Sequence, residues 1–406
     1  MISFLKNKKV RNWCFFDFGI SSFPTLVLTF FYGAFYARHI VGDITEGTSL
    51  WGFSLSLGSL LAASIFLLIL FISSSSLRKI NVKFFAVFFF ILIMSSSSLF
   101  FFNSESNKYY PLVLVVLSFI AFEVVNLFYN ISLDKVATKT SKGSISNLGW
   151  GFGYFGGFLA LLVVLISLKF VEGNTQATPL ILMLIGPFVG LWTLVFGYPH
   201  LSSLKKSYFS LPIIKDTLEE FRPSSLGWFI ISYFFFNNGV VCIFAFASMF
   251  SSFLFGLSES EILLMGVFIN LSGILGCLIL GRFDDRLGSE KCVLLCIIML
   301  TLLSGSLFLV KDTQLFWFIA ILIGFFIGPI QASSRSFISK KIKGKSQLSV
   351  FSFYSFLGNI CSVIGPLAVG LLINFTDSIR LGMLIIPLFF IISLIPDLTL
   401  YFGFQY

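Results

Sequence analysis

Repeated long apolar runs constrain the fold more than any other feature of this sequence. A helix needs about 20 apolar residues to cross the hydrocarbon core of a bilayer, and the 406 residues contain twelve such runs. Apolar residues make up 57% of the chain and charged residues only 11%, against about 25% charged in an ordinary soluble domain. A soluble protein of this size has to wet its surface and cannot carry so much apolar area. The sequence therefore predicts an all-α polytopic membrane protein with twelve transmembrane helices.

The expected spans fall into two groups of six. In the first half they lie near residues 13–37, 49–71, 84–102, 111–132, 147–168 and 179–197. In the second half they lie near residues 226–250, 261–281, 292–310, 314–336, 349–374 and 381–403. The longest polar stretch separates the groups. We therefore expect an N-terminal six-helix bundle (1–197), a cytoplasmic linker (198–225) and a C-terminal six-helix bundle (226–406).

The basic residues indicate how the chain is oriented. Of the 27 lysine and arginine residues, 22 lie at the N-terminus or in and beside the loops after spans 2, 4, 6, 8 and 10. Because cytoplasmic loops carry an excess of lysine and arginine, both termini and the linker are expected in the cytoplasm. We expect the membrane to be a bacterial inner membrane. The net charge of +9 is then a topology signal, and nucleic acid is not an expected partner.

The sequence contains no sign of an enzyme or of a bound cofactor. The six cysteines lie in or beside apolar segments and lack the spacing of a metal site. No nucleotide-binding loop, no Ser/His/Asp set and no soluble domain long enough to fold alone is present. Without an ATPase motif, active transport has to use an ion gradient or the gradient of the substrate. We expect a monomer in the bilayer that takes a small-molecule substrate and no cofactor or metal.

One carboxylate lies near the middle of an expected span. A helix that enters near Pro111 carries Glu123 about 18 Å inward, close to the midplane of a core about 30 Å thick. Asn126 and Asn130 follow at i+3 and i+7 on the same helical stripe. Ionisable groups at this depth usually face a bundle interior or a watery cavity, and desolvation favours the protonated acid. Glu123 is therefore the expected carrier if transport is coupled to protons; the alternative is a protonated carboxyl group that only bridges helices.

Other polar residues inside the spans complete the candidate site. Spans 3, 6, 9 and 12 are almost free of such residues and are expected to face lipid, whereas the others should face one another. The further candidates for substrate binding or ion coupling are Asp17, Asn237, Asn238, Asn270, Gln331, Arg335 and Asn359. The amides either contact substrate or only bridge helices. Arg335 either receives a substrate carboxylate through its fork or extends to the lipid headgroups.

A cluster of charges follows span 8, in the stretch GRFDDRLGSEK at 281–291. Gly281 and Gly288 permit a tight turn, while Asp284, Asp285 and Arg286 can pair with neighbouring helices or helix ends. We expect Asp284 and Arg286 to engage helix ends, or the loop after span 2, when the cytoplasmic side is closed. The alternative is a solvated basic loop that only sets the orientation.

Several stretches together resemble one transporter family. NWCFFDFGISSF at 12–23 is similar to the W-x-x-Y-D-x-A-N-S-x-F opening of the vacuole effluxer-like branch of the major facilitator superfamily. The resemblance continues, in the same order, through FEVVNLFYNISL (122–133), SISNLGWGFGYFGG (144–157), ISYFFFNNGV (231–240), GRFDDRLGSEK (281–291) and IQASSRS (330–336). It therefore covers both halves of the chain.

This resemblance implies two six-helix bundles that rock about a central site. It implies the export of amino acids or similar small metabolites. The sequence departs from the branch at Ser21-Ser22, at Asn238, where an Asp is expected, and in the loop after span 2, which lacks a Gly-x-x-x-Asp motif. We therefore expect a secondary transporter or facilitator for a small polar, amino-acid-like metabolite, with proton-coupled efflux as one form of the mechanism. The alternative is a flippase or exporter of an amphipathic molecule such as a lysolipid or a drug.

Overall fold

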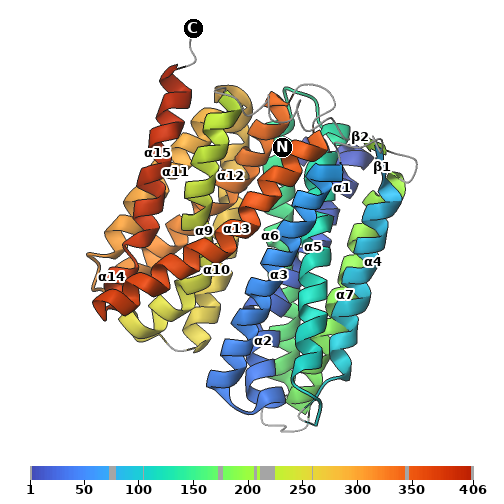
Figure 1. Ribbon diagram of the computed structural model, residues 1–406, viewed down its shortest axis with the longest axis vertical. Helices are drawn as coiled ribbons and strands as arrows, with labels where there is room; N and C mark the ends of the chain where they lie inside the picture. The colour runs from blue at the N-terminus through green and yellow to red at the C-terminus, as the bar shows by residue number, and fades with distance from the viewer. Residues whose placement is uncertain are drawn as a thin grey trace.

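The computed structural model describes residues 2–72, 79–103, 105–171, 177–204, 208–210, 225–257, 259–342 and 347–403. Within these ranges, twelve helical segments are long and apolar enough to cross a membrane. They form two six-helix bundles that stand side by side (Figure 1). The predicted fold class is therefore confirmed, and the protein is an integral, multi-pass membrane protein.

The first bundle contains one broken span and five continuous ones. Its long helices are α1 (Lys8–Ile20), α3 (Ile44–Ile72), α4 (Val82–Ser98), α5 (Tyr109–Val136), α6 (Lys142–Phe170) and α7 (Ala177–Ser203). After α1 the first span continues through π-helical segments at Pro24–Phe30 and Tyr36–Val41, which flank α2 (Tyr32–Phe35). Pro24 has no N–H to donate, which favours this local change in helical pitch.

The second bundle runs from α9 to α15. Its helices are α9 (Ser225–Phe255), α10 (Glu259–Leu287), α11 (Ser289–Leu307), α12 (Thr313–Lys341), α13 (Gln347–Thr376), α14 (Ile379–Gly382) and α15 (Ile385–Gly403). Both chain termini lie at the upper end of Figure 1. We call this end, where α1 begins and α15 ends, the terminal face, and the other end the opposite face.

The most buried spans are the first, fourth, seventh and tenth. In their most apolar windows, 61%, 50%, 56% and 56% of residues are buried, against 22–39% in the other eight described spans. These four spans correspond to the region around α1, α5, α9 and α12. They carry most of the polar candidates of the sequence, because polar groups inside a membrane protein need partners from neighbouring helices.

Glycines allow the helices of the first bundle to approach closely. A Cβ atom at Gly156 of α6 would lie 2.1 Å from the Phe18 carbonyl oxygen of α1, and one at Gly153 would lie 2.9 Å from Asp17 Oδ1. Small residues at helix contacts permit such close backbone approach. Gly153 and Gly156 therefore let α6 pack closely against α1 within the first bundle.

The two bundles meet through a limited set of helices. α6 packs against α10 and α12, while α13 packs against α3 and α5. At the terminal face, β1 (Lys79–Asn81), which follows α3, pairs antiparallel with β2 (Tyr208–Ser210), which follows α7. β2 also contacts α13, so this strand reaches from one bundle to the other. The remainder of the expected linker, residues 211–224, lies outside the described residues.

The helix α10 continues where the sequence predicted a turn. α10 runs to Leu287, so the expected tight turn at Gly281 is wrong, and Gly281 is an ordinary helical residue. The turn falls at Gly288, whose φ of +97° favours glycine. An apolar run marks only the membrane-embedded part of a helix. The helix can continue beyond it, because polar side chains there form hydrogen bonds with neighbouring helices.

Candidate substrate site and gate

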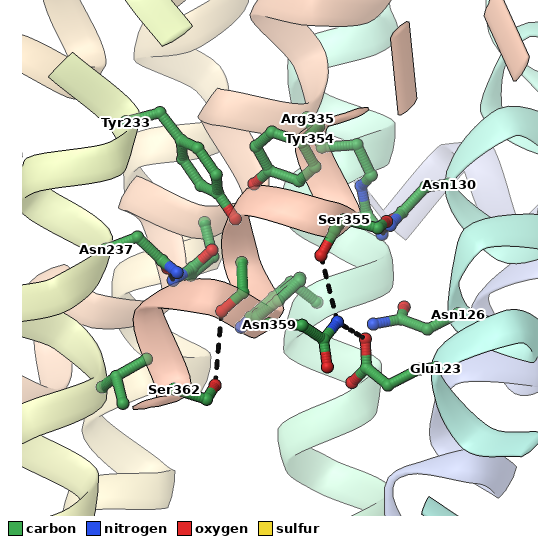
Figure 2. A pocket seen from close by; sticks show the side chains of 14 residues that line it. Glu123, Asn126, Asn130, Tyr233, Asn237, Arg335, Tyr354, Ser355, Asn359 and Ser362 are labelled. Carbon is green, nitrogen blue, oxygen red and sulfur yellow. Dashed lines mark hydrogen bonds between the residues drawn. The ribbon is translucent and has the colours of Figure 1, made fainter. Parts of the chain in front are cut away.

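A cavity of about 160 Å³ lies between the two bundles, near the middle of the spans. Figure 2 shows side chains from both bundles pointing into it. The first bundle contributes Glu123, Asn126, Asn130 and Trp150. The second contributes Tyr233, Asn237, Val241, Gln331, Arg335, Tyr354, Ser355, Gly358, Asn359 and Ser362. The lining is thus rich in amides and contains one acid and one base.

Glu123 is half-buried on α5 and is held from the other bundle. The Asn359 amide of α13 donates a hydrogen bond of 2.9 Å to Glu123 Oε2 and one of 3.0 Å to the Ser355 carbonyl of its own helix (Figure 2). The carboxylate therefore points into the cavity and not to lipid. This hydrogen bond joins α5 of the first bundle to α13 of the second.

The other wall of the cavity combines an amide pair with aromatic rings. Gln331 Nε2 of α12 donates to Asn237 Oδ1 of α9 over 2.9 Å. Tyr233 and Tyr354 stack with ring centroids 4.0 Å apart. A ligand in the cavity would therefore meet polar groups and flat apolar surfaces.

Three predicted candidates lie outside this cavity. Asp17 is buried and accepts a hydrogen bond of 3.2 Å from Ser21, one turn along its own helix. Asn238 donates to the Phe234 carbonyl and to Cys361 Sγ inside the second bundle. Asn270 donates to the Gly266 carbonyl of α10. The side chains of these residues leave their helices in other directions than the cavity, which a count of polar residues per span could not reveal.

Arg335 extends from α12 into the first bundle. Its Nε donates to Ser146 Oγ (2.9 Å), its Nη2 to the Ser146 carbonyl (2.7 Å) and its Nη1 to Asn130 Oδ1 (3.2 Å). Only 1% of the residue is exposed. The alternative in which Arg335 extends to the lipid headgroups is therefore wrong, because this face of α12 is covered by the first bundle.

The predicted gating cluster lies at the terminal face, but the residue that contacts a helix end is not one of the two that were expected to do so. Asp285 accepts hydrogen bonds from the backbone N–H groups of Gly143 (2.8 Å) and Ser144 (3.0 Å), at the first turn of α6. An acid at a helix N-terminus satisfies free N–H groups and the helix dipole. Gly281 takes part through its carbonyl, which accepts from Ser144 Oγ over 3.1 Å. Arg286 is exposed, so the expected helix-end contact belongs to Asp285 and not to Arg286.

Asp284 is the fully buried member of the cluster. It accepts from Lys340 Nζ (2.7 Å) and Ser289 Oγ (2.7 Å), both in the second bundle. A Cβ atom on Gly143 would collide with the Asp284 carboxylate, 2.2 Å from Oδ1. Asp284 therefore braces the end of α10 against which α6 packs, and does not itself cap a helix.

A second set of contacts at the terminal face was not foreseen from the sequence. Lys142 of α6 donates to the Ser339 carbonyl of α12 and forms an ion pair with Asp134. Ser339 Oγ in turn donates to Asp134 Oδ1 over 2.6 Å. In the sequence, Lys142 counts only as a topology signal, and no motif surrounds Asp134. Together with Asp285, these residues join the two bundles at the terminal side of the interface.

Fold and site together define a major facilitator superfamily transporter. The chain matches the family described as "Vacuole effluxer Atg22 like" over residues 131–401. It belongs to that family. The predicted family resemblance is therefore confirmed.

Individual relatives are distant in sequence. An uncharacterized MFS-type transporter, YxiO, of Bacillus subtilis is 22% identical over 301 residues, which cover 70% of this chain and 69% of that protein. Autophagy-related protein 22 of Cryptococcus neoformans is 22% identical over 289 residues, 64% of this chain and 50% of that protein. The matched region thus spans about half the length of this fungal relative.

A solved structure has the same fold. A bacterial homologue of the iron transporter ferroportin, in an outward-facing state, superimposes with a TM-score of 0.72 at 12% sequence identity. The superposition covers 97% of this chain and 98% of that one. At this identity the likeness concerns the fold alone.

Proposed function

We propose that the protein is a secondary transporter or facilitator that moves a small polar metabolite by alternating access, with the terminal face in the cytoplasm of a bacterial cell. One observation carries the proposal. A cavity lined by an acid, a base and several amides lies between two bundles that hydrogen bonds join at Glu123 and at the terminal face. Separation of these contacts would open the cavity toward the terminal face.

The lining favours a small, amino-acid-like solute. Glu123 can accept hydrogen bonds from an ammonium group, and the Asn237–Gln331 pair can both donate and accept. The Arg335 guanidinium lies at the edge of the cavity and offers donors to a carboxylate. The volume of about 160 Å³ suits a metabolite better than a whole lipid.

Proton coupling would use Glu123. Within the described residues the lining contains this one carboxylate, which accepts a hydrogen bond from a neutral amide, Asn359. The acid would carry a proton while the cavity faces one side and release it on the other. Asp17 is the second carboxylate within the spans, but it lies outside the cavity.

Opening at the terminal face would require Asp285 to leave the first turn of α6. Asp285 would then exchange its two backbone hydrogen bonds for bonds to water and lose its favourable interaction with the helix dipole. Lys142 would separate from the Ser339 carbonyl in the same movement. This gate consists of a few contacts, partly buried at Asp285 and buried at Lys142, which suits a reversible closure.

The second candidate is an exporter of an amphipathic molecule. The stacked pair Tyr233–Tyr354 and Trp150 give the cavity an apolar wall that would suit such a ligand. This candidate requires an apolar part of the ligand to occupy the space beside these rings.

Uptake and exchange in proteoliposomes would separate the two. A panel of radiolabelled amino acids and related metabolites is tested beside a fluorescent lysolipid, with protein-free liposomes as the control. We expect flux of at least one zwitterionic metabolite and none of the lysolipid. Lysolipid movement without any metabolite flux would replace the proposal with the second candidate. Protease protection of tags at both termini would test the orientation.

A further inference from the structure

We propose that Arg335 is an inner lock of the closed terminal side, a positioning residue of one bundle that is held in an aromatic box of the other. The box consists of Trp13, Tyr129 and Trp150. The inference rests on the proposed alternating access and adds to it a second closure, deeper than the gate at Asp285. Arg335 leaves the box whenever the terminal side opens.

Contacts within the first bundle hold the rings of the box in place. The rings of Trp13 and Tyr129 stack with centroids 4.3 Å apart and an angle of 18° between their planes. Trp13 Nε1 donates to the Tyr129 carbonyl (3.1 Å) and to Ser132 Oγ (3.0 Å), which fixes the indole ring. A side chain at Gly149 would enter this space, since its Cβ would lie 2.4 Å from Trp13. The rings are therefore positioned by their own bundle.

The guanidinium lies within reach of all three rings. Its central carbon is 4.9 Å from the centroid of Trp13, 4.7 Å from Tyr129 and 5.4 Å from Trp150. At such distances a cation is attracted by the ring faces, more strongly where water is excluded. The three hydrogen bonds to Ser146 and Asn130 add direction to this attraction. Every one of these partners belongs to the first bundle, whereas Arg335 belongs to the second.

The chemistry of the box suits a contact that has to open. The hydrogen-bond partners of Arg335 are neutral oxygens of Ser146 and Asn130. Among the described residues no carboxylate lies within ion-pair distance of Arg335, and Asp17 acts on it only at longer range. Breaking a buried ion pair leaves two uncompensated charges. Here no carboxylate in direct contact is left unpaired when the contact breaks, and water can replace each neutral oxygen. The box therefore holds Arg335 firmly while it remains dry and releases it once water enters.

The lock shares atoms with the substrate site. Arg335, Asn130 and Trp150 all line the central cavity. An anionic group of a ligand would therefore compete with Asn130 for the guanidinium. The gate at Asp285 has no such contact with the cavity lining. Arg335 is the residue through which occupancy of the cavity can influence closure of the terminal side.

Distances between spin labels on the full-length protein test the lock without any substrate. Thr140, in the connection before α6, and Leu287, at the end of α10, are exposed at the terminal face. All six native cysteines are buried and leave labelling to the introduced pair. In the otherwise native protein, we expect one short distance. Arg335→Ala should shift the ratio of short to long distances toward the long one by roughly tenfold or more.

Chemical rescue distinguishes a lock from general damage. Added methylguanidinium should enter the vacated box and restore the short distance, while Arg335→Lys should restore it only in part because an ammonium lacks the fork to Ser146. Arg380→Ala is the matched control, since Arg380 donates to the Phe308 and Val310 carbonyls within one bundle. This control should leave the distances unchanged.

Two results would overturn the lock. One is an Arg335→Ala protein with unchanged distances, and the other is a shift that methylguanidinium does not reverse. If Arg335→Ala does not fold, Trp150→Leu and Ser146→Ala keep the arginine and should shift the distances in the same direction by smaller amounts; unchanged distances in both would equally contradict the lock. Since no substrate is needed, failure of the lock is distinct from failure to find a transported metabolite.

Discussion

The terminal side of the interface and the central cavity both contain carboxylates, but these differ in how many hydrogen-bond partners they have. At the terminal side, charged groups have several partners each: Asp284 is bound by Lys340 and Ser289, and Asp285 by two backbone N–H groups. In the cavity, Glu123 accepts a single hydrogen bond from the described residues, donated by the Asn359 amide. The charged groups of the terminal side thus have more hydrogen-bond partners than the carboxylate of the cavity, which keeps hydrogen-bonding capacity for a ligand.

This difference has an energetic basis. Opening leaves the Asp284 partners in place but removes the Asp285 carboxylate from the Gly143 and Ser144 N–H groups. A charge that loses its hydrogen bonds is costly, so the terminal side resists opening. A carboxylate with one neutral partner can exchange it for a ligand at small cost. Substitutions at the two regions should therefore differ in size and in the property that they change.

The largest effect is expected from charge reversal at Asp284. In Asp284→Arg a second cation lies at a fully buried position beside Lys340, which costs about 3–5 kcal/mol. Transport per inserted protein should fall at least tenfold. The matched control is Glu290→Lys, which breaks the half-exposed pair with Lys341 and should cost only about 0–1 kcal/mol. Unchanged transport by Asp284→Arg at normal membrane levels would reduce the cluster to a topology signal.

A smaller and different effect is expected from Asn359→Ala. The change removes the one donor that holds Glu123 from the second bundle, and a hydrogen bond to a charged group contributes about 1.5–3 kcal/mol. We expect the apparent substrate affinity to fall about tenfold with the maximal rate less affected. Asn270→Ala removes an amide outside the cavity and should change neither value by more than about twofold. Equal effects of the two variants would remove Asn359 from the site.

The smallest effect is expected from Asp285→Asn. The Gly143 and Ser144 N–H groups bind different carboxylate oxygens, so the amide keeps one acceptor and loses the other together with the charge, a change of about 1 kcal/mol. The ratio of closed to open populations, measured with labels at Thr140 and Leu287, should fall about fivefold. Asp285→Ala should lower it further. If the alanine variant has the native ratio, the cap does not contribute to closure.

The sequence predicted the spans and the fold because both follow from local composition. Twelve apolar runs and the alternation of basic loops need no knowledge of distant contacts. The stripe of Glu123, Asn126 and Asn130 is also local, since i, i+3 and i+7 share a helix face. All three residues line the cavity.

The contacts of the site could not be predicted, because they join residues far apart in the chain. Asn359 and Glu123 are separated by 236 positions, and Arg335 and Asn130 by 205. No periodicity shows which face of α12 meets the first bundle. For the same reason Asn238 and Asn270 were counted with the cavity although they bond within their own bundle.

The most direct test of the account is proton-driven accumulation by Glu123→Gln. Glutamine imitates the protonated acid permanently and keeps a hydrogen-bonding group for Asn359. With a metabolite identified by the flux panel, the native protein should concentrate it in response to a proton gradient across the liposome. The Gln variant should lose this accumulation while retaining exchange of labelled for unlabelled metabolite. A variant that still concentrates the metabolite under the same gradient would contradict the role of Glu123 as the carrier between the two faces.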